Sequence, residues 1–344
     1  MVEVSEGRVA LITPFHKKEL FQKYLEAWGD FEGVTPFFIE DSDKKSFKPS
    51  ELPKGARYYC RKDIRKDLGE ASWIISTGCS AIKSYGFLKA YQEGFDYLLV
   101  LDDDCYPAPT KRIKRISDLA HSHYLALRSK RGYSNTFHVG EYLYGRGSPW
   151  MRGSPLRFRG VRSAVVSVGG WDVNPDLDAI TQMIEQSPKM SVYSNGFVNV
   201  PKGLGVTMCG MNFMMKREVV PAAYFLLQGP FWGVDRVDDI WAGLFLKKVL
   251  DHLELPMAVN SSATITHVRA SNVFNSLEQE GVSLLANETL WDRLSTINLE
   301  GSNIVDSYES LNNQLSPDWF VNKEVYGSYG KSLLRAMSVW RSFF

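Results

Sequence analysis

Short apolar runs alternate with amphipathic segments through the first third of the chain, and this alternation constrains the fold most. Residues 9–12, 35–39 and 97–101 are apolar runs of strand length. Residues 17–29 and 80–93 carry large apolar side chains at helical spacing. Apolar strands that alternate with helices are typical of a parallel sheet covered by helices on its faces. We therefore predict an α/β fold.

The remainder of the chain has a less regular pattern that ends in helices. The segments that we expect in it are strands at 163–168 and 263–267, helices at 216–227 and 238–252, and a loop rich in Gly, Arg, Ser and Pro at 145–160. Residues 44–58 contain two prolines and a Lys-Gly pair, so they are also expected to form a loop. We predict a catalytic domain at 1–271, followed by a helical C-terminal extension at 272–344.

Charge and cysteine content exclude several classes of partner. The 344 residues include 40 basic and 39 acidic side chains, and a net charge of +1 gives no strong field toward nucleic acid or an anionic membrane. No apolar stretch approaches the roughly 20 residues that a membrane-spanning helix needs. The first residues show no secretory signal pattern, and the four scattered cysteines form no CxxC pair. We expect a cytoplasmic protein with free thiols, no nucleic-acid partner and no transmembrane segment.

Three consecutive aspartates follow the apolar run at 97–101. Asp102, Asp103 and Asp104 repel one another unless a positive charge lies between them, and a divalent cation supplies that charge. Hard oxygen ligands suit Mg²⁺ or Mn²⁺. His267 ends the expected strand at 263–267 and could complete the metal shell. The alternatives are a solvated acidic turn and a structural histidine.

Two further groups of charged residues point to a bound ligand. Asp238 and Asp239 open the expected helix at 238–252, where they act either as dipole caps or as functional carboxylates. The five arginines of the Gly-rich loop region are Arg146, Arg152, Arg157, Arg159 and Arg162. A guanidinium group can bind two phosphate oxygens at once, although a solvated basic face is the simpler explanation for some of these arginines.

The chain has no P-loop and no GxGxxG motif, which disfavours a kinase-type ATP site and a Rossmann-type flavin site. Metal-dependent use of a nucleotide sugar is the reaction class that fits best.

Seven short segments of the chain form a recognisable set: RKDIRKDLG at 61–69, SAIKSYG at 80–86, DDDC at 102–105, PKG at 201–203, MCGMN at 208–212, VDDIWAG at 237–243 and HVRASN at 267–272. They resemble the motifs of one known family, the reversibly glycosylated polypeptides or UDP-arabinopyranose mutases. Each segment alone is weak, but together, in this order and spacing, they are specific. The resemblance implies a GT-A glycosyltransferase-like fold, a UDP-sugar ligand and a divalent metal. It also implies interconversion of the pyranose and furanose forms of UDP-arabinose without flavin.

The family also becomes glycosylated on an arginine, and WMRGSPLRFRG at 150–160 aligns with that segment. The resemblance places Arg152 on the glycosylated position and Arg159 on a second arginine needed for activity. The family's SHGLW reads SVGGW here, so that Val168 replaces a histidine.

We expect the nucleotide at the carboxyl ends of the first strands, where a doubly wound sheet opens its crevice. The residues assigned to nucleotide or sugar binding are Thr13, Pro14, Asp41, Arg61, Asp63, Lys83, Asp103 and Asn212. Asp102, Asp104 and His267 are assigned to the metal.

Ring contraction requires that the anomeric carbon be freed from the diphosphate and held while the ring opens and recloses. A nitrogen nucleophile suits this step, and a protonated guanidinium needs a nearby base. Arg152 is the expected nucleophile, with Asp238 or Asp239 as its base. Arg152 could instead only clamp phosphate. A glycosyltransferase and a non-catalytic UDP-sugar-binding scaffold are the alternative functions, and a homo-oligomer is expected.

Overall fold

The computed structural model describes residues 7–109, 112–128, 163–172, 174, 176–184, 196–268, 272–320 and 328–344. The five arginines at 146–162 lie outside the described residues, and so does the loop at 145–160. Among the described residues, no helix combines the length and the apolar character that crossing a bilayer requires.

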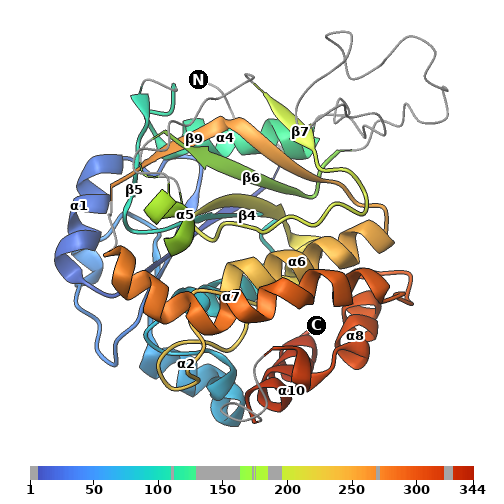
Figure 1. Cartoon of the computed structure of the whole chain (residues 1–344). Helices are drawn as coiled ribbons and strands as arrows, with labels where there is room; N and C mark the ends of the chain where they lie inside the picture. Colours follow the sequence, from blue (N-terminus) through green and yellow to red (C-terminus); the bar gives the residue numbers. More distant parts are fainter. Residues whose placement is uncertain are drawn as a thin grey trace, which may run out of the picture.

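One mixed sheet of nine strands runs through the described part of the chain, in the order β3-β2-β1-β4-β8-β6-β9-β5, with β7 beside β9 (Figure 1). The strands are β1 Val9–Phe15, β2 Thr35–Glu40, β3 Arg57–Cys60, β4 Tyr97–Leu101, β5 Cys105–Tyr106, β6 Val166–Trp171, β7 Phe197–Asn199, β8 Asn212–Lys216 and β9 Met257–His267. Strands β3, β2, β1 and β4 are parallel. This confirms the parallel arrangement predicted for the first third of the chain.

The second half of the sheet departs from that arrangement. Strand β8 pairs antiparallel with both β4 and β6, and β9 pairs antiparallel with β5 and β7. Strand β8 was not expected, and β3 occupies the end of the predicted loop at 44–58. The predicted helix at 216–227 is wrong over half of its length, since only Arg217–Ala222 is helical, and that part is a 3₁₀ helix. Pro221 in that 3₁₀ helix lacks the amide hydrogen that a longer helix needs.

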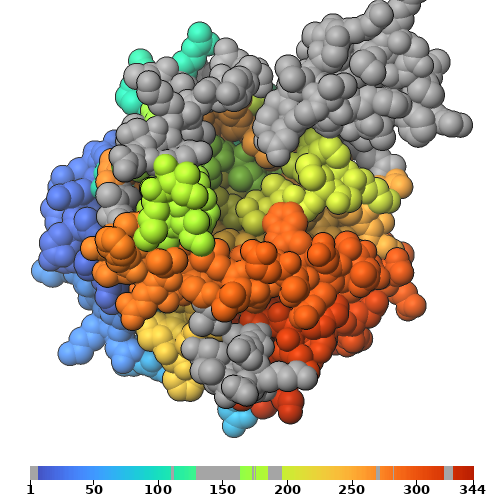
Figure 2. Space-filling view, in the orientation of Figure 1, coloured from blue at the N-terminus to red at the C-terminus, as the bar shows by residue number. Residues whose placement is uncertain are grey.

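Helices cover both faces of the sheet (Figure 1). They are α1 Lys18–Trp28, α2 Arg61–Leu68, α3 Lys83–Gln92, α4 Ile116–Arg128, α5 Ala179–Ile184, α6 Asp238–His252, α7 Val273–Thr296, α8 Ile304–Gln314 and α10 Tyr329–Arg341. Figure 2 shows α7 lying across one face of the molecule with α5 beside it. The contact includes a hydrogen bond of 2.8 Å from the Ala179 amide to the Glu280 carboxylate. The predicted class, α/β with a helical C-terminal part, is confirmed.

Alternate residues of the central strands enter two separate hydrophobic clusters. Val9 and Leu11 of β1 pack in a cluster with α1 and α4, whereas Ala10 and Ile12 pack in a cluster with α3 and α6. Strand β4 alternates in the same way. The period of two along a strand explains why these strands are apolar at every position.

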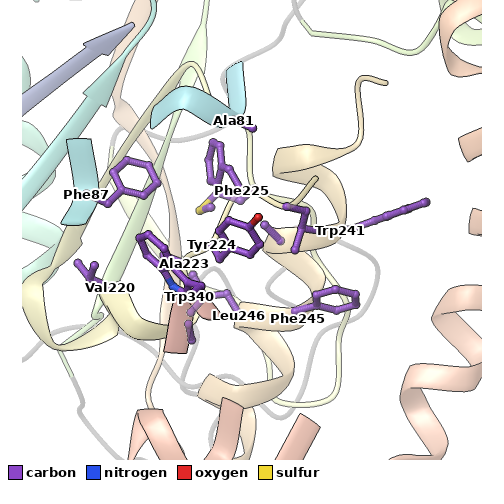
Figure 3. Packing of buried hydrophobic residues seen from close by; sticks show 14 of the residues in the cluster. Ala81, Phe87, Val220, Ala223, Tyr224, Phe225, Trp241, Phe245, Leu246 and Trp340 are labelled. Carbon is purple, nitrogen blue, oxygen red and sulfur yellow. The ribbon is translucent and has the colours of Figure 1, made fainter. Parts of the chain in front are cut away.

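The C-terminal helices belong to the same hydrophobic cluster as α3 and α6. The Trp340 ring of α10 stacks on Tyr224 with 5.3 Å between ring centroids, and its Nε1 donates to the Pro221 carbonyl at 3.0 Å. Figure 3 shows Trp340 beside Tyr224 and Ala223. Described residues on both sides of position 271 therefore share one core, and the division of the chain at that position stays a prediction.

Candidate active site at the carboxyl ends of the strands

The three aspartates form a tight turn at the carboxyl end of β4. The Cys105 amide donates to the Asp102 carbonyl at 3.1 Å, and the Asp102 amide donates to the Met211 carbonyl at 3.3 Å. Because β1, β2 and β4 are parallel, their carboxyl ends lie at one edge of the sheet. The turn is therefore at the edge where the sequence predicts a ligand.

Strand pairing brings His267 to this turn. His267 of β9 lies opposite Cys105 of β5, and its Nε2 lies 3.6 Å from Oδ2 of Asp104. Its Nδ1 lies 2.8 Å from the Asn174 carbonyl and donates to it, which leaves Nε2 toward the carboxylate. Burial lowers the pKa of His267, but the contact with Asp104 outweighs burial and the net shift is upward.

The donor set at this turn fits a divalent cation. A carboxylate and an imidazole nitrogen face each other, and the second ring nitrogen of His267 is fixed by a carbonyl, as is usual for metal-binding histidines. Burial, with help from Asp104, raises the pKa of Asp102 to about 6, against the opposing effect of Lys83. A cation would favour the ionised forms of both aspartates.

Lys83 is fully enclosed beside the same turn. Its side chain is 1% exposed, and its ammonium lies 2.6 Å from Oδ1 of Asp102. The ammonium also donates to the Gly210 carbonyl at 2.9 Å. Burial lowers the pKa of Lys83, but Asp102 and Asp238 outweigh it, so that the net shift is upward and the ammonium stays protonated.

The start of α6 contributes the second acidic pair. Ser80 donates a hydrogen bond to Asp238, and the Gly210 amide donates to Oδ2 of Asp239 at 2.6 Å. The Gln228 side-chain carbonyl accepts from the amides of Val237 and Asp238, at 3.2 and 3.3 Å, and so caps the first turn of the helix. Burial, together with Asp238 and a further aspartate, raises the pKa of Asp239.

The residues assigned to the nucleotide occupy the neighbouring strand ends. Arg61 Nε lies 2.5 Å from Oδ1 of Asp41, whose Oδ2 accepts from the Gly78 amide at 2.7 Å. Thr13 is buried against Tyr24, with 3.1 Å between the two hydroxyl oxygens. Residues 76–80 thus connect the Asp41–Arg61 pair to Asp238, since Gly78 contacts Asp41 and Ser80 contacts Asp238.

The four remaining assigned residues lie around this edge. Asp63 accepts from the Cys60 amide at 2.9 Å and so caps α2. Pro14 and Asp103 are half-buried. Asn212 is fully buried at the start of β8, opposite Leu101 of β4, and its side-chain amide donates to the Ala263 carbonyl at 2.7 Å.

The structure thus brings Lys83, Asp102, Asp104, Asp238, Asp239 and His267 together, and it leaves Thr13, Pro14, Asp41, Arg61 and Asp63 along the ends of β1, β2 and β3. Arg152 and Arg159 lie outside the described residues.

Sequence reasoning assigned no role to three residues that contact or lie close to the second acidic pair, namely Asp176, Cys209 and Gln228. Cys209 donates to Asp176 with 3.4 Å between sulfur and oxygen, and both lie close to Asp239. Burial and Asp176 raise the pKa of the Cys209 thiol, which favours a protonated hydrogen-bond donor. The MCGMN segment drew attention to Cys209, but no local pattern indicated Asp176 or Gln228, because their partners are distant in sequence.

Fold and site together define an α/β protein with a cluster of charged residues at the carboxyl ends of its parallel strands. The chain belongs to the reversibly glycosylated polypeptide family, whose sequence profile matches residues 5–342. This confirms the resemblance seen in the sequence motifs.

Curated relatives of the chain are named as mutases. UDP-arabinopyranose mutase 1 of Oryza sativa subsp. japonica is 32% identical over 299 residues, covering 85% of this chain and 80% of the relative. UDP-arabinopyranose mutase 3 of Arabidopsis thaliana is 34% identical over 262 residues, covering 75% of this chain and 70% of the relative.

Solved structures of low similarity include glucosyl-3-phosphoglycerate synthase from Mycobacterium tuberculosis. Its complex with Mn²⁺, UDP and phosphoglyceric acid has a TM-score of 0.45 at 9% identity, covering 86% of this chain and 81% of that chain. The complex with Mn²⁺, UDP and glucosyl-3-phosphoglycerate has a TM-score of 0.44 at 10% identity, covering 83% and 80%. The fold class rests on the sheet and helices of the chain itself.

Proposed function

We propose that this chain is a metal-dependent, flavin-independent mutase that interconverts the pyranose and furanose forms of UDP-arabinose. One observation carries the proposal: carboxylates from the ends of β4 and the start of α6 converge on the buried ammonium of Lys83, with His267 beside them. Membership in the reversibly glycosylated polypeptide family, and the names of the curated relatives, support the substrate. We also propose that the chain acts in the cytoplasm as a homo-oligomer.

The nucleotide is assigned to the ends of the first strands. Thr13, Pro14, Asp41, Arg61 and Asp63 lie on the side where the crevice of a doubly wound sheet opens. Asp41 and Arg61 are held by each other, so their positions at the strand ends are fixed before uracil and ribose bind.

The aspartate turn is assigned to the diphosphate side. Asp102, Asp104 and His267 are the residues that would hold the divalent cation, and Asp103 is assigned to the sugar. When bound, a divalent cation neutralises the negative charge of a departing diphosphate. The Asn174 carbonyl keeps the His267 ring oriented for this role.

Arg152 is assigned to the covalent step. Its guanidinium transfers a proton to Asp238 or Asp239 and forms a bond from nitrogen to the anomeric carbon, while the bond from that carbon to the diphosphate oxygen breaks and UDP departs. The raised pKa of Asp239 suits a carboxylate that accepts a proton near neutral pH. Arg159 orients the leaving group. Ring opening and reclosure on the other hydroxyl, followed by return to UDP, complete the exchange.

The test is incubation with Mn²⁺ and UDP-arabinopyranose without flavin, followed by chromatography of the nucleotides and intact-protein mass spectrometry. We expect the furanose nucleotide and a protein adduct of one sugar that excess UDP reverses. Arg152→Lys should abolish both, because an ammonium of different length misplaces the nucleophile. Arg157→Lys, in the same loop, is the matched control and should retain both.

Other results would assign the chain differently. Free UDP with sugar passed to another acceptor would make the chain a transferase, and no turnover would leave a UDP-sugar-binding scaffold. An Arg152→Lys variant whose rate recovers at saturating substrate would limit Arg152 to binding phosphate.

A further inference from the structure

Lys83 is the first residue of α3, and its charge lies inside the protein. The side chain is 1% exposed, although lysine is almost never fully buried unless it is paired. Its ammonium contacts two protein oxygens: Oδ1 of Asp102 at 2.6 Å and the Gly210 carbonyl oxygen at 2.9 Å. The ammonium nitrogen also lies over the Phe225 ring, 5.7 Å from the ring centroid. These contacts leave little of the ammonium for a nucleotide.

The contact with Gly210 ties Lys83 to the second acidic pair. Lys83 holds the carbonyl of Gly210 while Asp239 holds its amide at 2.6 Å, so that one peptide segment is clamped from two sides. A Cβ atom on Gly210 would lie 3.1 Å from the Lys83 nitrogen and 3.2 Å from the Asp239 oxygen, closer than side chains ordinarily approach. A side chain at position 210 would therefore push the two charged groups away by a few tenths of an ångström.

The clamp connects three separate parts of the site. Asp102 directly follows β4, Gly210 precedes β8, and Asp239 is the second residue of α6. The Asp102 amide donates a hydrogen bond to the carbonyl of Met211, the residue after Gly210. This bond is a second link between the aspartate turn and the segment before β8, besides the contacts of Lys83. Removing one partner of a buried ion pair leaves the other without compensation, which displaces or protonates it.

We propose that Lys83 is a positioning residue that holds Asp102 for the divalent cation, and Asp239 through Gly210, and that it does not contact the nucleotide. This role rests on the proposed function for the identity of the ligand and for the divalent cation. It predicts that Lys83 matters to UDP binding only when the metal is present. A lysine that touched UDP directly would matter in both conditions.

The test measures UDP affinity by calorimetry, in Mn²⁺ and in EDTA, for the wild-type chain and for Lys83→Met, which keeps the length of the side chain without its charge. We expect the UDP dissociation constant in EDTA to stay within about twofold of wild type, and the gain from Mn²⁺ to fall by roughly tenfold, the usual effect of losing a group that orients a metal ligand. Lys89→Met is the matched control: Lys89 lies on the same helix and pairs with Asp67 at 3.1 Å. It should bind UDP as wild type does in both buffers.

Two further variants, Asp102→Asn alone and combined with Lys83→Met, keep the test decisive if Lys83→Met folds poorly. In an Asp102→Asn background the lysine has lost its charged partner, so adding Lys83→Met should produce little further loss of the Mn²⁺-dependent gain. The double variant should also be more stable than Lys83→Met alone, because neither member of the pair is left charged and buried.

Three results would overturn the role of Lys83. They are an equal loss of UDP affinity in both buffers, an Mn²⁺-dependent gain that survives in Lys83→Met, and additive effects of the two substitutions. A wild-type chain that binds UDP equally with and without Mn²⁺ contradicts the metal in the proposed function instead. In that case the ligand-free stability of the four variants still decides whether Lys83 positions Asp102.

Discussion

A buried histidine holds together the strands behind the aspartate turn. His123 of α4 is fully enclosed, with Nδ1 at 2.8 Å from the Ser167 hydroxyl and Nε2 at 3.0 Å from the Asn212 side-chain oxygen. Asn212 in turn donates to the Ala263 carbonyl. The network joins α4 to β6, β8 and β9, and β8 is the strand beside β4. Burial lowers the pKa of His123 to about 4, so the ring is neutral at physiological pH.

The pKa shift of His123 makes the stability of the protein depend on pH. Because its pKa is lower in the folded chain than the usual 6.5, the unfolded chain takes up a proton first as pH falls. Stability from this residue is complete above pH 6.5 and is lost between pH 6.5 and 4, by up to about 3 kcal/mol at roughly 1.4 kcal/mol per pKa unit. Urea denaturation across this range measures the loss.

His123→Gln should be less stable at pH 7 but should show a smaller loss on acidification. His252→Gln is the control, since His252 makes its hydrogen bond of 2.8 Å to the Gly301 carbonyl away from this network. Equal pH slopes in wild type and His123→Gln would show that this histidine does not titrate as its burial implies.

Single residues could be selected from the sequence, but their surroundings could not. The aspartates at the end of β4 were recognisable because an apolar run precedes them, and strand pairing did bring His267 to Asp104. Nothing in the segment 80–86 indicated that Lys83 points inward. Its burial depends on Asp102 and Gly210, which arrive from distant parts of the chain.

At the level of elements, α6 approaches the segment before β8 through a glycine. A Cβ atom on Gly243 would lie 2.3 Å from the Met208 amide nitrogen, a distance that real side chains do not tolerate. The contact places the first turn of α6, with Asp238 and Asp239, against the segment that contains Gly210. Helix packing at this point therefore sets the position of the second acidic pair.

Two helical glycines should respond oppositely to alanine. Gly243→Ala should destabilise the chain by about 1–3 kcal/mol, because overpacking forces the helix away from Met208. Gly281→Ala in α7 has no neighbour within 4 Å of the new Cβ and should stabilise it by up to about 1 kcal/mol through helix propensity. Chemical denaturation of both variants measures the difference. A Gly243→Ala chain as stable as Gly281→Ala would mean that α6 does not press on this segment.

The sequence pattern identified the elements in which buried side chains recur at regular spacing along the chain. Strands β1, β2 and β4 and helices α1, α3 and α6 lie where apolar runs and helical spacing placed them. Strand β8 was not predicted, because its residues, NFMMK, form an apolar run too short to distinguish a strand from part of a helix. Its antiparallel entry between β4 and β6 depends on pairing partners that local sequence does not specify.

For the whole molecule, the open question is whether the C-terminal helices are an appendage or part of the core. Tyr329 of α10 donates from its hydroxyl to the Leu227 carbonyl at 2.7 Å, and Trp340 bonds to Pro221. Tyr224, which stacks on Trp340, donates to the Ile74 carbonyl at 2.6 Å. A chain of contacts thus runs from α10 to the segment that follows α2. Helical periodicity predicted these helices but could not show what their apolar faces cover.

Replacing Trp340 distinguishes the two possibilities. If α10 is part of the core, Trp340→Ala should cost about 3–5 kcal/mol of unfolding free energy, the usual loss for a fully buried tryptophan. The loss should appear in a single transition, followed by fluorescence and by circular dichroism. Trp291→Ala is the matched control: its side chain is 40% exposed, so a loss of roughly 1 kcal/mol is expected. An independent extension would instead melt in a separate, earlier transition in Trp340→Ala and leave the main transition, and UDP binding, unchanged. That result would place a domain boundary near residue 272.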